Sequence, residues 1–389
     1  MAIKQDEMDL EFSKKLAKEI GDSFQKCFQC GTCTARCPAG NVSQYRVRKL
    51  MRMAQLGLKE RIFDSDEIWN CTTCSTCKIL CPWGVDTVST ILRLRAEAVD
   101  AGHENKKHDP LVKSLQSYDN PWLQPRSARR KWYKKLDNVV DLSKNPGEAD
   151  VLYYVGCTAT FDPRLWNMAQ SVVKVLGKAG ITVGVLGKEE KCCGGTVRGV
   201  GHPDIFEGLA KRNIEDFNKS GVDTIIFSCP GCLNTIMNAY KTIGEIKPRM
   251  VHVVEYVAEL LEEGKLKLDK DVGRIITYHD PCHLGKHCEV FDPPRDVLKA
   301  IPGVEFKEMD FIRENSWCCG AGGGVKTAYP DRATELASNR LKEAEDTGAD
   351  TITSACSFCY QNLLDGIKQS DSKLEMKDIM EIVAEAIEE

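Results

Sequence analysis

The sequence lacks features that would place it in several broad classes of protein. It has no apolar run approaching the roughly 18 residues that a membrane-spanning helix needs, and its first 20 residues contain no apolar signal-peptide core. With 53 basic and 57 acidic residues, it has no basic excess of the kind that binds nucleic acid. We therefore expect a cytoplasmic protein with no membrane span of its own, which reaches a membrane only through a partner subunit.

Cysteine, in contrast, is abundant, with 19 in a chain of 389 residues. A disulfide framework is typical of small secreted domains. A chain long enough for two or three domains in a reducing compartment uses its thiols as metal ligands or catalysts instead. The spacing of the cysteines then indicates which metal they bind.

Two similar cysteine runs lie in the N-terminal quarter. Each follows the pattern C-x2-C-x2-C-x3-C-P, with Cys27, Cys30, Cys33 and Cys37 in the first run and Cys71, Cys74, Cys77 and Cys81 in the second. In ferredoxins of this pattern three thiolates bind one cubane and the fourth reaches the neighbouring cluster. We therefore expect one [4Fe-4S] cubane on Cys27, Cys30, Cys33 and Cys81, and another on Cys71, Cys74, Cys77 and Cys37. Zinc is the alternative, but a tetrahedral zinc site has no use for a third C-x2 step and a trailing Cys-Pro.

The segments around these runs have helical periodicity. Apolar residues recur at helical spacing in residues 11–20 and 45–63, and residues 87–102 form another helical pattern that ends at a glycine. We expect an all-α, ferredoxin-like domain over residues 1–105. Residues 106–147 mix charges and prolines without a sustained period, which predicts a surface linker with its basic run, residues 126–135, in solvent.

From about residue 148 the chain repeats itself. Cys157 recurs 125 residues later as Cys282, and the vicinal pair Cys192–Cys193 recurs after 126 residues. In each copy, short β-branched runs stop at the cysteines and helical segments separate them, which is typical of parallel α/β sheets. We expect the cysteines beyond the carboxyl ends of the strands, where such sheets bind ligands. The two predicted α/β domains span residues 148–270 and 271–389.

Each repeat offers five cysteines, which we call the first and the second quintet. The first quintet is Cys157, Cys192, Cys193, Cys229 and Cys232, and the second is Cys282, Cys318, Cys319, Cys356 and Cys359. Five thiolates are one more than a cubane needs. A glycine-rich turn after each vicinal pair can bring both sulfurs to one side, where one can bridge two irons, and can leave room for backbone N–H groups and a substrate. Buried structural thiols are the alternative.

Other residues near the quintets could bind an anionic substrate group or supply protons. Near Cys282 these are His279, His283, Lys286 and His287, and beside the vicinal pairs they are Lys191, Arg198 and Lys326. The alternatives are local hydrogen bonding for the first group and solvated surface cations for the second. We expect the nineteenth cysteine, Cys288, to be a packed or surface thiol.

The cysteine spacing resembles a known family. The series C-x34-CC-x35-C-x2-C from residue 157 and C-x35-CC-x36-C-x2-C from residue 282 is similar to the tandem CCG domains of heterodisulfide reductases. The N-terminal part resembles their helical ferredoxin subunit, and the whole resembles the D subunit of that family. The resemblance implies a noncubane [4Fe-4S] cluster on each quintet, so that all ten of these cysteines are catalytic. It also implies a substrate, the mixed disulfide of coenzyme M and coenzyme B of methanogenesis, between the two clusters.

The resemblance further implies an electron-donating subunit, either a flavoprotein or a membrane cytochrome b, that feeds the quintets through the two cubanes. Two other interpretations stay open. The same clusters could reduce a protein-borne disulfide or trisulfide in a sulfur-respiring membrane complex, or the chain could relay electrons for a 2-hydroxy-acid oxidase. Relatives that serve such oxidases have lost CCG cysteines, whereas this chain keeps all ten, which favours disulfide chemistry.

Overall fold

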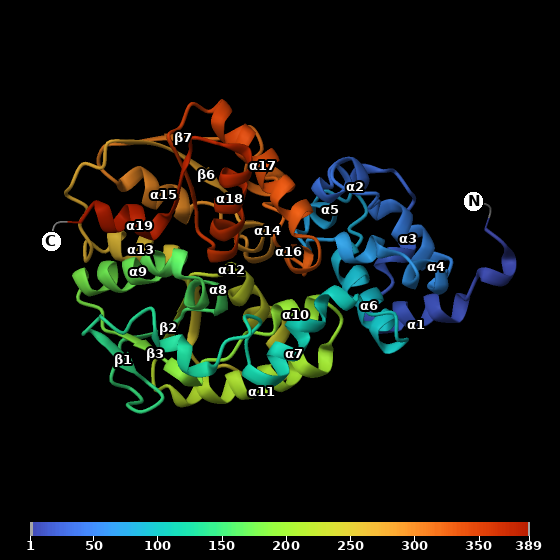
Figure 1. Cartoon of the computed structure of the whole chain (residues 1–389), viewed down its shortest axis with the longest axis horizontal. Helices are drawn as coiled ribbons and strands as arrows, with labels where there is room; N and C mark the ends of the chain where they lie inside the picture. The colour runs from blue at the N-terminus through green and yellow to red at the C-terminus, as the bar shows by residue number, and fades with distance from the viewer. Residues whose placement is uncertain (1–2, 388–389) are drawn as a thin grey trace.

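The computed structural model describes residues 3–387, which form a helical N-terminal module and two α/β repeats (Figure 1). The N-terminal module lies to one side, and the two repeats lie against each other on the other side, the first below the second in this view. Across residues 3–387, no helix combines the length and the apolar character that crossing a lipid bilayer requires.

The N-terminal module consists of helices and the cysteine runs between them. The α-helices are α1 (Leu10–Ile20), α2 (Thr32–Ala35), α3 (Val47–Gln55), α4 (Lys59–Phe63), α5 (Thr76–Ile79) and α6 (Thr87–Asp100). The predicted all-α module is confirmed, but the segment 45–63 holds two helices rather than one. Gly57 turns the chain there with φ of +65°, and a Cβ at this position would lie 1.7 Å from the carbonyl oxygen of Asp9. Only glycine fits this close backbone approach.

Each repeat contains one sheet, and all of its strand pairs are parallel. The first sheet has the order β1-β3-β2-β4-β5, with β1 (Val139–Asp141), β2 (Val151–Tyr154), β3 (Val183–Val185), β4 (Thr224–Phe227) and β5 (Arg249–His252). The second sheet has the order β7-β6-β8-β9, with β6 (Arg274–His279), β7 (Val304–Lys307), β8 (Thr351–Ser354) and β9 (Glu375–Asp378). The predicted pair of parallel α/β repeats is confirmed, and the two sheets share one strand order apart from the extra strand β1.

Helices cover both sheets and join the repeats. Those of the first repeat are α8 (Cys157–Phe161), α9 (Trp166–Lys178), α10 (Gly195–Gly199), α11 (Pro203–Lys219), α12 (Pro230–Asn234) and α13 (Val253–Glu262). Those of the second are α14 (Cys282–Cys288), α15 (Pro293–Ala300), α16 (Val325–Ala328), α17 (Pro330–Asp346), α18 (Ser357–Ser370) and α19 (Ile379–Glu385). Helix α9 packs against α19, and α13 packs against α15, so one apolar core continues from repeat to repeat.

The predicted surface linker over residues 106–147 is wrong in part. It contains helix α7 (Asp109–Tyr118), and strand β1 joins the edge of the first sheet. The basic run is not all in solvent, because Arg129 and Trp132 are each only 2% exposed. The indole of Trp132 meets the ring of Tyr153 edge to face, with centroids 6.0 Å apart. A three-residue strand and single buried side chains leave no periodic pattern in the sequence, which is why they were missed.

Arg95 of α6 connects the N-terminal module to both repeats. Its side chain is fully buried and donates hydrogen bonds of 2.7 to 2.9 Å to four carbonyl oxygens, those of Ile68, Cys71, Gly199 and Gly323. Gly199 and Gly323 follow the two vicinal cysteine pairs along the chain. This buried guanidinium donates to carbonyls of the N-terminal module and of both repeats, and so fixes the position of these three parts relative to one another.

Candidate active site

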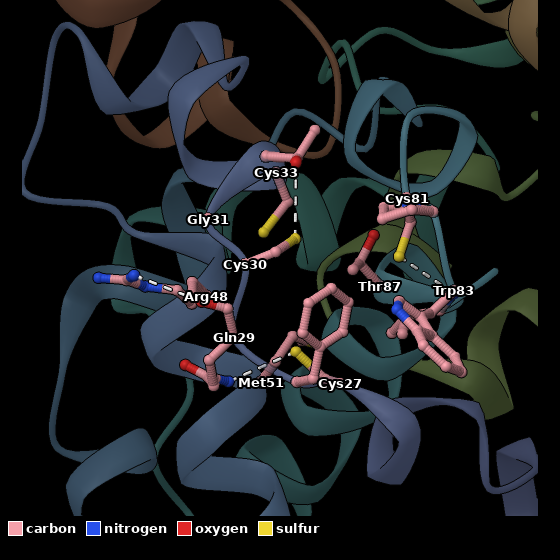
Figure 2. A pocket seen from close by; sticks show the side chains of 14 residues that line it. Cys27, Gln29, Cys30, Gly31, Cys33, Arg48, Met51, Cys81, Trp83 and Thr87 are labelled. Atoms are coloured by element: carbon pink, nitrogen blue, oxygen red, sulfur yellow. Dashed lines mark hydrogen bonds between the residues drawn. The ribbon is translucent and has the colours of Figure 1, made fainter.

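The first ferredoxin set, Cys27, Cys30, Cys33 and Cys81, lines one pocket in the N-terminal module (Figure 2). The pocket, with its open mouth, holds about 380 Å³ free of protein atoms. Cys30 is exposed and the other three cysteines are half-buried. The structure thus brings Cys81 of the second run to the three leading cysteines of the first, as the spacing predicted.

The second ferredoxin set, Cys71, Cys74, Cys77 and Cys37, lies deeper, with all members but Cys37 buried. Burial raises the pKa of Cys37, and the negative charges of Cys74 and Cys71 raise it further, which places these sulfurs near one another. Thr73 and Ser75, on either side of Cys74, have left-handed φ values of +57° and +65°. These strained residues curl the loop around its middle cysteine.

The first quintet gathers where strands β2 and β4 end. Cys157 begins α8, Cys192 and Cys193 lie before α10, Cys229 caps α12 and Cys232 lies in its first turn. The thiols lie close enough to shift one another's pKa: Cys192 shifts that of Cys157, Cys193 that of Cys192, and Cys193 and Cys229 that of Cys232. All five sulfurs therefore belong to one continuous cluster beyond the carboxyl ends of the strands, in accord with the prediction.

The second quintet has the same arrangement beyond strands β6 and β8. Cys282 begins α14, Cys318 and Cys319 lie before α16, Cys356 caps α18 and Cys359 lies in its first turn. The sulfurs of Cys319 and Cys359 are 3.3 Å apart, and hydrogen bonds join Cys318 to Cys282 and to Cys319.

The glycines after the vicinal pairs have two roles. The amides of Gly194 and Gly320 lie 3.4 and 3.3 Å from the sulfurs of Cys192 and Cys318, so backbone N–H groups approach the cysteine sulfurs at these turns. The expected room for a substrate is not found at Gly323, because a Cβ there would lie 2.3 Å from the carbonyl oxygen of Cys71. At this position glycine instead allows the second repeat to contact the N-terminal module.

Several quintet thiols have a lowered pKa. Hydrogen bonds from Cys192 and Cys232 lower the pKa of Cys193, and those from Cys318 and Cys359 lower the pKa of Cys319. Thiolate is the form that binds metal. A dense group of soft sulfur donors, with some already favoured as thiolates and with N–H donors beside them, fits an iron–sulfur cluster.

Three of the cysteine sets contact one another in a series. Cys74 of the second ferredoxin set packs against Cys282 and Cys318, and the thiols of Cys74 and Cys318 shift each other's pKa. At the other end of the second quintet, the thiols of Cys356 and of Cys229 in the first quintet lie close enough to shift each other's pKa. The sets that lie next to one another are therefore the second ferredoxin set, the second quintet and the first quintet, in this order. The first ferredoxin set, which contains the exposed Cys30, is the most exposed of the four.

A buried ion pair supports the first quintet. Arg129 donates from Nη1 to Glu190 Oε1 at 2.6 Å and from Nη2 to the sulfur of Cys157 at 3.2 Å. Burial raises the pKa of Glu190. The charge of Arg129 and the hydrogen bonds from the amides of Val155 and Gly156 act in the opposite direction and lower this pKa. Arg129 and Glu190 were not predicted, because Arg129 lies in a run that has the composition of a solvated surface.

Helix α14 connects the second quintet to the N-terminal module. The buried Nζ of Lys286 donates to Thr76 Oγ1 and to the carbonyl of Ser316, both at 2.6 Å. The ring of His287 donates from Nε2 to the carbonyl of Thr73 at 3.0 Å, and burial lowers its pKa to about 3. Both side chains are thus engaged by the protein, which favours the alternative of local hydrogen bonding over substrate binding.

The remaining predicted residues differ in their surroundings. Lys191 is buried and paired with Asp216, so the alternative of a solvated surface cation is wrong there. Lys326 is half-buried and donates to Asn362 and Asp365, both at 2.7 Å. Arg198 is exposed, with its guanidinium 5.6 Å from the ring centre of Phe206. Cys288 is half-buried beside the core of the first repeat, as expected of a packed thiol, and burial raises its pKa to about 12.

Comparison with known proteins matches both parts of the chain. The model of the cysteine-rich domain family, CCG, matches residues 151–237 and 276–364, and that of a 4Fe-4S dicluster domain matches residues 23–85. The chain is 35% identical to the D subunit of the dihydromethanophenazine:CoB–CoM heterodisulfide reductase of Methanosarcina mazei, over 94% of each chain. It is 30% identical to the EtfAB:quinone oxidoreductase of Syntrophomonas wolfei, over 94% of this chain and 58% of that protein.

Among solved structures, a hypothetical protein from Helicobacter pylori has a similar fold. The TM-score is 0.55 at 12% sequence identity, with 100% of this chain and 73% of that chain covered. At this identity the likeness concerns the fold alone.

Proposed function

Because the chain belongs to the family of heterodisulfide reductase D subunits, which are iron–sulfur oxidoreductases, we propose that it reduces the mixed disulfide of coenzyme M and coenzyme B to two thiols. Each turnover consumes two electrons and two protons as the S–S bond breaks. We propose two cubane [4Fe-4S] clusters on the two ferredoxin sets and a noncubane [4Fe-4S] cluster on each quintet. These clusters supply one-electron transfer and iron that binds sulfur.

The contact between the quintets carries this proposal. Cys229 and Cys356 are within hydrogen-bonding reach, although they belong to different repeats. A disulfide accepts two electrons, whereas an iron–sulfur centre passes one at a time. Two quintets side by side can therefore act on the two sulfurs of one bond, with all ten quintet cysteines as catalytic residues.

His283 is our candidate for the proton that a product thiol needs. Its Nδ1 lies 3.6 Å from the sulfur of Cys282, and its ring stacks on that of His287 at 4.5 Å. Burial lowers the pKa of His283, but the charge and hydrogen bond of Cys282 and the charges of Cys229 and Cys74 together outweigh burial, so the net pKa is raised. A raised pKa keeps more of the ring protonated near neutral pH.

We propose that electrons enter at the first ferredoxin set from another subunit, a flavoprotein or a membrane cytochrome b. Cys30 is exposed there, and the rings of Phe28 and Trp83, which lie 5.4 Å apart, are 56% and 59% exposed beside it. An exposed aromatic pair next to a redox centre suits docking of a redox partner. The donor then keeps the chain on the cytoplasmic side of a membrane or in the cytoplasm.

The test is an anaerobic assay of the purified chain with a reduced viologen as electron donor. The wild type should reduce the coenzyme M–coenzyme B disulfide faster than other disulfides and should hold about sixteen irons, since four four-iron clusters are proposed. Replacing Cys193 or Cys319 by Ala should abolish disulfide reduction while the cubane spectra remain. The matched control is Cys288→Ala, which removes a thiol outside every set and should keep full activity.

Unchanged turnover in both quintet variants would exclude the quintets as the reaction site. Iron-loaded protein that reduces no disulfide but passes electrons to a quinone or an acceptor protein would favour the role named for the EtfAB:quinone oxidoreductase. If the chain prefers protein-borne disulfides or trisulfides, the proposed substrate is wrong and the rest of the proposed mechanism stands.

A further inference from the structure

His279 is a fully buried side chain at the end of strand β6, three residues before Cys282. One of its ring nitrogens lies with the sulfurs of Cys319 and Cys359 in a group whose atoms are all within 4.8 Å of one another. Across the part of the chain that the structure describes, its Nε2 has no hydrogen-bond partner. A buried polar atom without a partner beside two sulfur ligands calls for an explanation.

Arg340 of α17 determines which nitrogen of His279 carries a proton. The guanidinium is 1% exposed, and its Nε donates to Nδ1 of His279 at 3.2 Å. Because a guanidinium N–H can only donate, Nδ1 must accept and is unprotonated. The proton of the neutral ring is then on Nε2, the nitrogen that is left for the sulfurs.

The equivalent position in the first repeat is different. Tyr154 ends strand β2 three residues before Cys157, but its hydroxyl donates to the carbonyl oxygen of Lys191 at 2.6 Å. The hydroxyl hydrogen of Tyr154 is therefore bonded to a backbone carbonyl, whereas the hydrogen on Nε2 of His279 can be donated to a sulfur.

We propose that His279 is a positioning residue of the second quintet, whose Nε2–H donates a hydrogen bond to the sulfur of Cys319 and so raises the reduction potential of the centre bound there. The inference rests on the proposed iron–sulfur centre of the second quintet. Hydrogen bonds to cluster sulfurs are among the factors that set the reduction potential, because they stabilise the more negative, reduced state. His279 thereby makes the second centre easier to reduce than the same centre without this donor.

The experiment is a redox titration of the anaerobically purified, iron-loaded chain, followed by electron paramagnetic resonance. His279→Leu removes the donor and should lower the equilibrium constant for one-electron reduction of the second-quintet centre about tenfold, or about 59 mV for a one-electron couple. His279→Gln keeps an N–H at the distance of Nε2 and should restore most of this shift. Tyr154→Phe, the matched change in the first repeat, should leave the second-quintet centre unchanged.

Iron analysis distinguishes the failure of this inference from that of the proposed function. If the second quintet binds iron and His279→Leu leaves its potential unchanged, the inference is wrong and the proposed function stands. If wild-type protein holds no iron at the second quintet, the proposed function is wrong. Should His279→Leu not fold, wild-type protein with ¹⁵N-labelled histidine serves instead. Weak nitrogen coupling that disappears in His279→Gln supports the hydrogen bond, whereas strong coupling typical of a direct iron ligand overturns it.

Discussion

The two quintets sit at equivalent places in two sheets of the same strand order, yet different groups surround their sulfurs. In the first repeat the sulfur of Cys157 accepts a hydrogen bond from the guanidinium of Arg129. In the second repeat Cys282 has His283 as its neighbour and packs against Cys74 of the N-terminal module. The shared cysteines agree with the proposal of one kind of centre in both repeats, and under that proposal the different neighbours give the two centres different tasks.

Under the proposed function, this difference decides which centre receives electrons first. The second quintet contacts the second ferredoxin set directly, and helix α14 fixes that contact through Lys286, whose Nζ bonds Thr76. For the first quintet, the contact with another cysteine set that is found within residues 3–387 is that of Cys229 with Cys356 of the second quintet. Three predictions test this asymmetry, beginning with the largest effect.

Two buried arginines provide the strongest comparison between the repeats. Arg129 pairs with Glu190, and Arg295 pairs with Asp280 through two bonds of 2.8 and 2.9 Å. Replacing either by Gln leaves a buried carboxylate without its cation, which should cost about 3–5 kcal/mol of unfolding free energy. Anaerobic denaturant unfolding measures both losses.

Only one of the two changes should also alter a metal centre. Arg129 touches a quintet sulfur, and no bond from Arg295 to a sulfur is found in residues 3–387. Arg129→Gln should therefore change the resonance spectrum of the first-quintet centre, and Arg295→Gln should leave both spectra as they are. Arg130→Gln, at a side chain that is 48% exposed, is the control for charge alone. Equal spectral changes in the two variants would remove this distinction between the repeats.

The second prediction concerns the order of electron transfer. Cys318→Ala removes the sulfur that meets Cys74, and reduction of the first-quintet centre by a viologen should then slow by about an order of magnitude or more, since coupling follows contiguous contacts. Cys192→Ala, the equivalent change in the first repeat, should leave the reduction rate of the second-quintet centre unchanged. Rapid freezing followed by electron paramagnetic resonance measures both rates. Equal slowing in the two variants would mean that electrons do not follow this order.

The sequence predicted the features that depend on local spacing. The C-x2-C-x2-C-x3-C runs and the repeated vicinal pairs predicted which cysteines belong to each set, and the structure brings the members of each set together. This prediction was possible because the loops are short and the strands end at the cysteines. The parallel sheets followed from β-branched runs separated by helical segments. The binding of clusters by these sets remains a proposal.

The features that were missed depend on contacts between distant segments. Arg129 reaches Cys157 over 28 residues and Glu190 over 61, and nothing in the charged run around it distinguishes this arginine from its exposed neighbour Arg130. Arg95 contacts Gly323 from 228 residues away. In sequence, each is one of many arginines on a helix or in a loop, and only the assembled fold decides which one is buried.

The third prediction uses the contact between His108 and the glycine loop of the second repeat. The ring of His108 is 2% exposed and donates from Nε2 to the carbonyl of Gly324 at 3.1 Å, and burial lowers its pKa to about 4. In the unfolded chain the pKa of this histidine is near 6.5, so between pH 6.5 and 4 the unfolded chain binds the proton more tightly than the folded protein does. The free energy of unfolding therefore falls as the pH falls through this range. The loss due to this one group should be about 1 kcal/mol between pH 6 and 5.

His108→Gln keeps a donor for the Gly324 carbonyl but cannot titrate, so its unfolding free energy should fall by less than that of the wild type over the same pH interval. Anaerobic denaturant unfolding at pH 7, 6 and 5 measures the two slopes. Parallel slopes would mean that acid acts on this interface through other groups. The next of these to replace is the half-buried His287, which lies between Thr73 and the second quintet. A flatter slope in His108→Gln would assign acid sensitivity to the interface between the second repeat and the N-terminal module, across which we propose that electrons pass to the second quintet.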